Sequence, residues 1–380
     1  MSVASGPNPV TNGLVFEYDM TNTSRSWIGM PITNLLPTPL TISSTWTKEG
    51  GFGTVTPNYG YAPDGTQTST LCVFTGGYLY YTLTLTPGVT YTFSCYVKGS
   101  AQTGRGIGLW SYAVGGIVAA SSQAINADTW TRVSVTYTVA SGASSFAIML
   151  AGYPSNIFQG TIEVWHPQLE VNSFASPFVD GTRSNTQSLL DATTNNTITS
   201  SSLTYGSNNT FSYNGSSNYT DCGNAPAIAA ITGTSAVSVE AWVNLSGYGS
   251  TSGYGVITHK GYPWAWLMEN PSNTMRIRFY LSSSGDVSCP DSSTHALNTW
   301  YQFVGTYDGS NMRFYRNGTL TNTVAGSGTL GGSGLNMVTG AYSGAYFAQG
   351  QIPVVKIYNR TLSASEVTQN FNAYRGRYGI

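Results

Sequence analysis

Polar and apolar residues alternate along most of the chain with the two-residue period of β-strands. In residues 91–97 and 133–139 every second side chain is apolar, and a Thr-Pro-Gly turn at 86–88 precedes the first of these runs. Successive side chains of a strand point to opposite faces, so one face of each run is expected in a core and the other toward solvent. With residues 146–150 and 161–165, these runs predict a first β-sandwich.

A second set of strand-like runs begins near Leu203. Its main members are residues 237–243, 275–281, 300–307 and 312–316. Asn317-Gly318 predicts a tight hairpin after the last of them, because these two residues suit the positive φ angles of a type I′ turn. Residues 352–358 are expected to be the final strand, and Pro353 indicates an edge or a bulge there. A second sandwich is therefore predicted.

The C-terminal segment departs from the β pattern. Ser363 and Glu366 have the spacing of a capping box, and Val367, Phe371 and Tyr374 recur at helical spacing. We expect a short amphipathic helix here. The predicted fold class is all-β: two antiparallel β-sandwich (jelly-roll) domains with a short C-terminal helix.

Several separated segments carry a family resemblance. In order and spacing they resemble the laminin G-like, concanavalin A-like jelly rolls of bacteriophage particle proteins; the segments are residues 188–191, 211–215, 219–223, 239–243, 298–309, 358–367 and 371–380. Residues 12–19 resemble the opening strand of the same fold. The middle of the chain more loosely resembles β-sandwich carbohydrate-binding modules, through residues 85–94 and 129–133.

The resemblance implies an interrupted jelly roll. Residues 1–31 would supply its first strand, residues 32–180 would form an inserted carbohydrate-binding-module-like sandwich, and residues 181–380 would complete the laminin G-like domain. A chain of 380 residues is long enough for two cores. Insertion into a surface loop has a modest entropic cost. We therefore expect residues 14–18 to pair with the C-terminal sandwich.

Composition narrows the classes of partner. Only 8% of residues are charged and the formal net charge is −1, so the basic field that phosphate binding needs is missing and nucleic acid is not expected as a partner. The apolar runs are too short to span a bilayer, so membrane insertion is not expected. Residues 1–10 lack the pattern of a signal peptide.

Catalytic and metal chemistry find little support. Glu17 and Asp19 share a strand face, but a glycosidase needs two carboxylates across a cleft, and solvated or capping roles are favoured. The histidines, His166, His259 and His295, lack metal-ligand spacing. Relatives in the resembling family often carry acidic residues that could bind calcium at this place, but residues 214–219 of this chain are neutral. No cofactor or metal is predicted.

Two smaller sets of residues leave alternatives open. Asp221, Asp286 and Asp308 could still contribute to a calcium site, although turn aspartates are favoured. The four cysteines, Cys72, Cys95, Cys222 and Cys289, are expected to be buried free thiols rather than disulfides.

Aromatic residues are the positive signal for a ligand. The chain contains 26 Tyr, 9 Trp and 44 Gly. This composition is closer to that of a binding surface than to that of an active site. Aromatic rings can lie against sugar C–H faces, which predicts carbohydrate-binding residues in two places: Trp110 and Tyr112, and Tyr248, Tyr254, Tyr262, Trp264 and Trp266. Burial or a subunit interface is the alternative for Trp264 and Trp266. Trp130, Trp242 and Trp300 are expected to lie in strands and to pack in a core or on a sheet surface.

The resemblance implies a phage virion protein displayed on capsid or tail, and together with the aromatic composition it predicts a non-enzymatic protein that binds host or environmental glycans. Its expected partners are glycans and other virion proteins, and the resemblance implies a homo-oligomer, for which a trimer is one form. A decoration or cement protein is the alternative, and a glycan depolymerase is a third.

Overall fold

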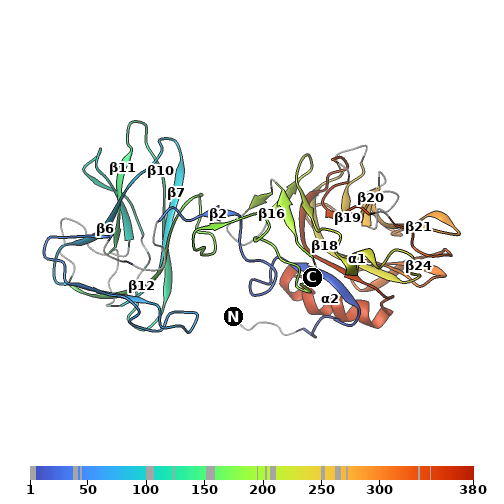
Figure 1. The fold of residues 1–380 in the computed structure, drawn as a ribbon. Coiled ribbons are helices and arrows are strands. Elements are labelled where there is room, and N and C mark those ends of the chain that lie inside the picture. Colours follow the sequence, from blue (N-terminus) through green and yellow to red (C-terminus); the bar gives the residue numbers. More distant parts are fainter. Residues whose placement is uncertain are drawn as a thin grey trace. The chain divides into compact units, whose positions relative to one another are not determined.

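The computed structural model describes residues 6–36, 42, 45–99, 107–121, 123, 125–150, 159–194, 196–201, 203–205, 211–249, 253–261, 267–270, 273–332, 334–342 and 344–380. The chain divides into two compact units (Figure 1). Unit 1 comprises Met1–Met30 and Asn185–Ile380, and unit 2 comprises Pro31–Ser184. Both are built of antiparallel sheets, which confirms the predicted all-β class.

Unit 1 is a jelly roll of two sheets. The first holds, in spatial order, β15 (Thr204–Tyr205), β16 (Phe211–Asn214), β27 (Gln349–Tyr358), β18 (Val237–Gly247), β23 (Trp300–Tyr307), β24 (Asn311–Arg316) and β25 (Thr319–Ala325). The second holds β14 (Thr199–Ser201), β17 (Tyr219–Asp221), β26 (Met337–Thr339), β19 (Val256–Lys260), β20 (Leu267–Asn270), β21 (Thr274–Leu281) and β22 (Gly285–Pro290). Alternate residues of both sheets meet in one core, where Val239, Ile277 and Phe303 are fully buried.

The N-terminal strand completes the first of these sheets. β1 (Leu14–Asp19) pairs antiparallel with β27, so that Glu17 lies opposite Lys356. Figure 1 shows this blue strand beside the red C-terminal helix. The predicted pairing of residues 14–18 with the C-terminal sandwich is confirmed.

Helix α2 (Ala364–Tyr378) covers the outer face of the same sheet. Ser363 and Glu366 form the predicted capping box, and Gly379 ends the helix in a left-handed conformation. Val367 and Tyr374 are buried against the sheet, where Tyr374 packs beside Trp242. The other helix, α1 (Pro226–Ala229), is a single turn. In the part of the chain that is described, no helix has the length and apolarity to cross a membrane.

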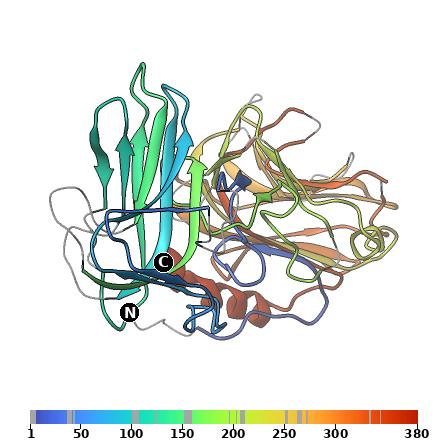
Figure 2. The ribbon, with the colours of Figure 1, turned by 60° about the vertical axis from the view of Figure 1, so that its left-hand side comes forward.

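Unit 2 is a second sandwich, whose strands run side by side in Figure 2. One sheet has the order β10 (Thr131–Thr138), β7 (Thr90–Gly99), β12 (Gly160–Val171), β5 (Thr70–Phe74) and β4 (Thr54–Thr56). The other has the order β3 (Thr47–Glu49), β6 (Tyr78–Thr84), β11 (Ser145–Leu150), β8 (Ile107–Ser111) and β9 (Gly116–Ala120). β2 (Ile32–Thr33) pairs with β13 (Thr182–Arg183), which brings the two ends of the unit together.

Local expectations are met at several points. Asn317 and Gly318 both have positive φ and join β24 to β25. Pro353 lies in β27, an internal strand, at an irregularity in its pairing with β18, so the bulge rather than the edge accounts for it. The expected free thiols are confirmed, since all four cysteines are unpaired and buried.

Candidate functional site

A groove of about 380 Å³ lies on unit 2, on the outer face of the sheet that begins with β3. Its lining side chains share a predominantly aromatic character; they are Glu49, Tyr78, Tyr80, Trp110, Tyr112, Ala147 and Met149. The volume falls within the range of small-molecule sites, about 300–1,000 Å³. Trp110 and Tyr112, two residues predicted to bind carbohydrate, therefore line one cavity.

Strand register explains why these side chains share a face. Ala147 lies opposite Trp110, and Met149 lies opposite Tyr80, in antiparallel pairs. Glu49 lies opposite Tyr78. Residues directly opposite each other point to the same side of a sheet, while the residues between them point to the other side. The intervening Leu79, Leu109 and Ile148 are accordingly fully buried in the core of the unit; these three have no exposed surface.

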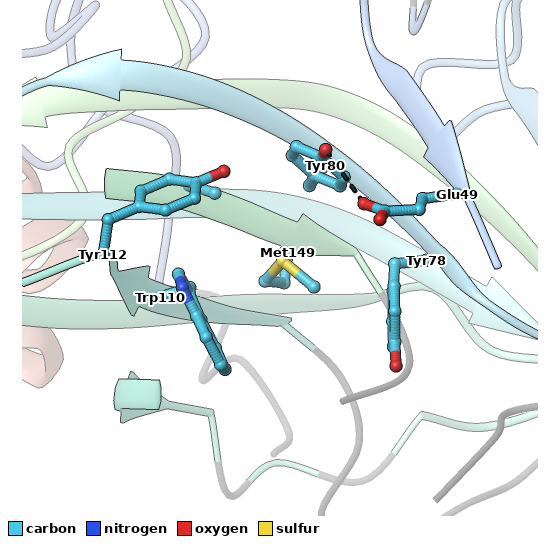
Figure 3. Close-up of a pocket in the computed structure, with 7 residues that line it drawn as sticks. Glu49, Tyr78, Tyr80, Trp110, Tyr112 and Met149 are labelled. Carbon is cyan, nitrogen blue, oxygen red and sulfur yellow. Dashed lines mark hydrogen bonds between the residues drawn. The ribbon is translucent and has the colours of Figure 1, made fainter. Parts of the chain in front are cut away.

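The groove has aromatic walls and an apolar floor. Figure 3 shows the rings of Trp110 and Tyr78 on either side of Met149, with Tyr112 on the same side as Trp110. Ala147 is nearly fully buried and contributes only a methyl group next to Trp110, so space remains above the sheet. Tyr112 is 49% exposed. A flat, partly apolar ligand could therefore contact rings on two sides.

One carboxylate gives the groove a polar end. The Tyr80 hydroxyl donates a hydrogen bond of 3.1 Å to Oε2 of Glu49 (Figure 3). Burial, and then this hydrogen bond, raise the pKa of Tyr80 above its ordinary value. Tyr80 is therefore a neutral hydrogen-bond donor at neutral pH, and it orients the carboxylate beside the aromatic walls.

Sequence reasoning missed five lining residues, Glu49, Tyr78, Tyr80, Ala147 and Met149. A local signal existed for the tyrosines, since they alternate with Leu79 and Leu83 and so had to point away from the core. Nothing local indicated Glu49, whose place in the groove depends on pairing with Tyr78 across 29 residues of sequence, from position 49 to position 78.

The remaining predicted ligand residues belong to unit 1 and are not brought into this groove. Tyr248 packs edge-on against His295, with ring centroids 5.7 Å apart. The ring centroids of Tyr254 and Tyr346 lie 6.2 Å apart, and Cζ of Arg276 lies 5.3 Å from the centroid of the Tyr254 ring. Tyr262, Trp264 and Trp266 lie outside the described residues. Carbohydrate binding by these five residues stays a prediction.

The acidic pair weighed for catalysis has structural partners. Oε1 of Glu17 lies 3.0 Å from Nζ of Lys356, and Oδ2 of Asp19 lies 2.7 Å from Arg377. Tyr374 of helix α2 donates a further hydrogen bond to Glu17. Both carboxylates are thus held by cations at the packed face between the sheet and α2.

The candidate metal ligands also have other roles. Asp286 pairs with Arg278, which holds the pKa of that carboxyl below its usual value, and Asp308 pairs with Arg313. Asp221 accepts a hydrogen bond from Asn336. His166 stacks between Trp165 and Phe178, and burial lowers its pKa to about 4. Among the residues that the structure describes, no cluster of three His, Cys, Asp or Glu could hold a metal ion.

Known proteins resemble the chain only in part. The binding domain of botulinum neurotoxin serotype G is 17% identical over 49% of this chain and 48% of that chain, with a TM-score of 0.40. A second structure is titled "Cell entry of botulinum neurotoxin type C is dependent upon interaction with two ganglioside molecules". It is 15% identical over 50% of this chain and 50% of that chain, with a TM-score of 0.39. Trypanosoma rangeli sialidase is 16% identical over 49% of this chain and 30% of that chain, with a TM-score of 0.38. The chain thus spans half or less of each, and no curated protein sequence matches it.

A family match covers most of unit 1. The sequence model described as "Concanavalin A-like lectin/glucanases superfamily" matches residues 214–368. That range runs from the end of β16 to the first residues of α2 and so includes most strands of both sheets. The chain therefore contains a jelly-roll domain of the concanavalin A-like, laminin G-like type.

Proposed function

We propose that this protein is a non-enzymatic glycan-binding adhesin and that the groove of unit 2 holds the sugar. The observation that carries the proposal is the juxtaposition of Trp110, Tyr78 and Met149 with the carboxylate of Glu49 in one groove of about 380 Å³. A sugar ring has apolar C–H faces and polar hydroxyl edges. The groove offers ring faces for the former and hydrogen-bond acceptors for the latter.

The contact area suits weak binding repeated many times. A groove of this size covers only a short stretch of glycan, and small ligands gain limited free energy per atom. Many copies on one particle would raise the effective concentration of the second and later contacts. We therefore propose display on a bacteriophage capsid or tail, in keeping with the resemblance of the C-terminal segments, and attachment to host or environmental glycans.

We propose that the jelly roll does not catalyse the cleavage of a glycan. Glu17 and Asp19, the closest pair of acids along the sequence, are each neutralised by a basic residue and lie beneath helix α2. An acid–base pair for glycoside cleavage needs a sugar between its two carboxyl groups. Reducing-end release that is lost in Glu17→Gln or Asp19→Asn would overturn the non-enzymatic assignment.

Alanine substitution of Trp110 tests the binding site. We expect Trp110→Ala to weaken monovalent glycan binding at least about tenfold, because a central aromatic contact of an interface commonly contributes more than 1.4 kcal/mol. Tyr78→Ala removes the opposite wall and should have a similar effect. A glycan array with a multivalent form of the protein finds the ligand, and titration calorimetry with the best oligosaccharide measures both variants.

Tyr61→Ala is the matched control. Tyr61 belongs to the same unit, is 70% exposed and does not line the groove. Its substitution should leave affinity unchanged, and thermal unfolding should show that all three variants are folded. Equal affinity of Trp110→Ala, Tyr78→Ala and the wild type would remove the groove as the binding site.

A further inference from the structure

We propose that the groove selects uncharged sugar residues and rejects glycans that carry a carboxylate or sulfate at the bound residue. The inference rests on the proposed function and names the chemical class of its ligand. It follows from the distribution of charge around the groove.

The described lining carries a single charged side chain, and that side chain is an acid. Glu49 faces Tyr78 and Tyr80, and the rest of the lining is aromatic, aliphatic or thioether. A carboxylate offers about four acceptor positions, and one of those of Glu49 receives the Tyr80 hydroxyl. The others suit donors, and two neighbouring hydroxyls of a sugar present two donors side by side.

The described basic residues of unit 2 are directed elsewhere. Lys48 lies opposite Leu79, a core residue, so it points away from the groove. On the other sheet Lys98 pairs with Glu163 at 3.0 Å, and Arg132 donates to the carbonyl of Ser176. Arg183 donates to the carbonyls of Pro177 and Phe178. Within the described residues, therefore, no cation of this unit offsets the charge of Glu49.

An anionic sugar would meet this charge without compensation. Its carboxylate or sulfate would lose water on entering an aromatic groove and would approach a like charge, and both effects disfavour binding. A neutral sugar instead donates to Glu49 through charge-assisted hydrogen bonds, which are stronger than neutral ones. Selection thus combines an attractive contact for one class with a repulsive contact for the other.

The experiment compares matched ligands. Neutral hexose oligosaccharides and the same oligosaccharides oxidised to 6-carboxylates are titrated into the full chain at low and physiological salt. We expect the wild type to bind the neutral form at least about tenfold more tightly, with the difference shrinking as salt rises. Glu49→Gln should weaken neutral binding about tenfold and narrow the discrimination, because the charge is lost while the shape is kept.

Tyr80→Phe separates charge from orientation. It removes the hydroxyl that holds Glu49 but keeps the carboxylate, so discrimination should persist while neutral affinity falls by less than in Glu49→Gln. Equal binding of both ligand classes by the wild type, or discrimination unchanged in Glu49→Gln, overturns the inference. If Trp110→Ala also leaves all binding intact, the proposed function fails with it; if Trp110→Ala abolishes binding, only the ligand class is wrong.

Discussion

Replacing Lys356 by methionine is expected to lower the free energy of unfolding of unit 1 by about 3–5 kcal/mol at neutral pH, the usual cost of removing one member of a buried ion pair. The Lys356 side chain is fully buried. It lies opposite Glu17 on one neighbouring strand and opposite Glu240 on the other. Nζ is 3.0 Å from Glu17 and 4.5 Å from the centre of the Tyr374 ring. Without this cation the fully buried Glu240 and the mostly buried Glu17 lose the positive charge that lies between them.

The loss of stability in Lys356→Met is expected to depend on pH. Burial raises the pKa of Glu240, and the charge of Lys356 opposes that rise. A carboxyl whose folded pKa is raised costs stability when it ionises, above the unfolded pKa, and costs nothing below it. The loss in Lys356→Met should therefore be largest near pH 7, shrink as the pH falls toward the ordinary glutamate value of 4.5, and be smallest below that value.

Lys98→Met is the matched control. Lys98 and Glu163 also lie 3.0 Å apart, but their side chains are 23% and 13% exposed. This pair should contribute less than about 1 kcal/mol, as ion pairs near the surface do. Denaturant unfolding measures both variants, with hydrogen exchange to assign the transition of unit 1 to β27 for Lys356→Met and that of unit 2 to β7 for Lys98→Met. Equal losses in the two variants, or a Lys356→Met loss that does not change with pH, would contradict the buried charge network.

The sequence could predict most of the strands because the signal for each is local. Alternation in residues 91–97 places Phe93 and Cys95 inside the sandwich, where both are fully buried. Asn317-Gly318 fixes a turn through its own backbone preferences, and Ser363 with Glu366 fixes a helix start. In each case the residues that determine the structure lie within a few positions of one another.

The candidate site depended on longer-range pairing. Trp110 and Tyr112 could be singled out because aromatic residues beside glycines are conspicuous in a sequence. The partners of Trp110 in the groove come from β3, β6 and β11, and only the register of these strands brings them together. Pairings of strands distant in sequence are not encoded by local composition, so the carboxylate of Glu49 could not be assigned to the site.

The same limit applies to the acids of β1. Two carboxylates at positions 17 and 19 suggest chemistry when they are read alone. Their basic partners, Lys356 and Arg377, are more than 330 positions away in the sequence and reach them only because β1 pairs with β27 beneath α2. A buried ion pair and a catalytic pair look alike until the counter-charges are placed.

Trp242→Ala is expected to destabilise unit 1 by about 3–5 kcal/mol and to release the C-terminal half of α2, because it opens a large cavity beneath the helix. Trp242 is fully buried in β18. Its ring stacks on Phe371 at 5.8 Å and on Tyr378 at 4.7 Å, two residues of α2 about two turns apart. This single side chain therefore holds both the middle and the end of the helix against the sheet.

Trp242→Phe distinguishes ring packing from hydrogen bonding. The indole Nε1 of Trp242 has no hydrogen-bond partner among the described residues, so phenylalanine gives up contact area but no hydrogen bond. Its loss should be less than half that of alanine. Trp300 is partly exposed, and its ring centroid lies 4.3 Å from that of Tyr378 near the end of the helix, so Trp300→Ala should likewise cost less. Urea unfolding ranks the three variants, and hydrogen exchange reports on α2. Full protection of α2 in Trp242→Ala would mean that the helix is held by its cap and by Val367 instead, because those contacts lie at its other end.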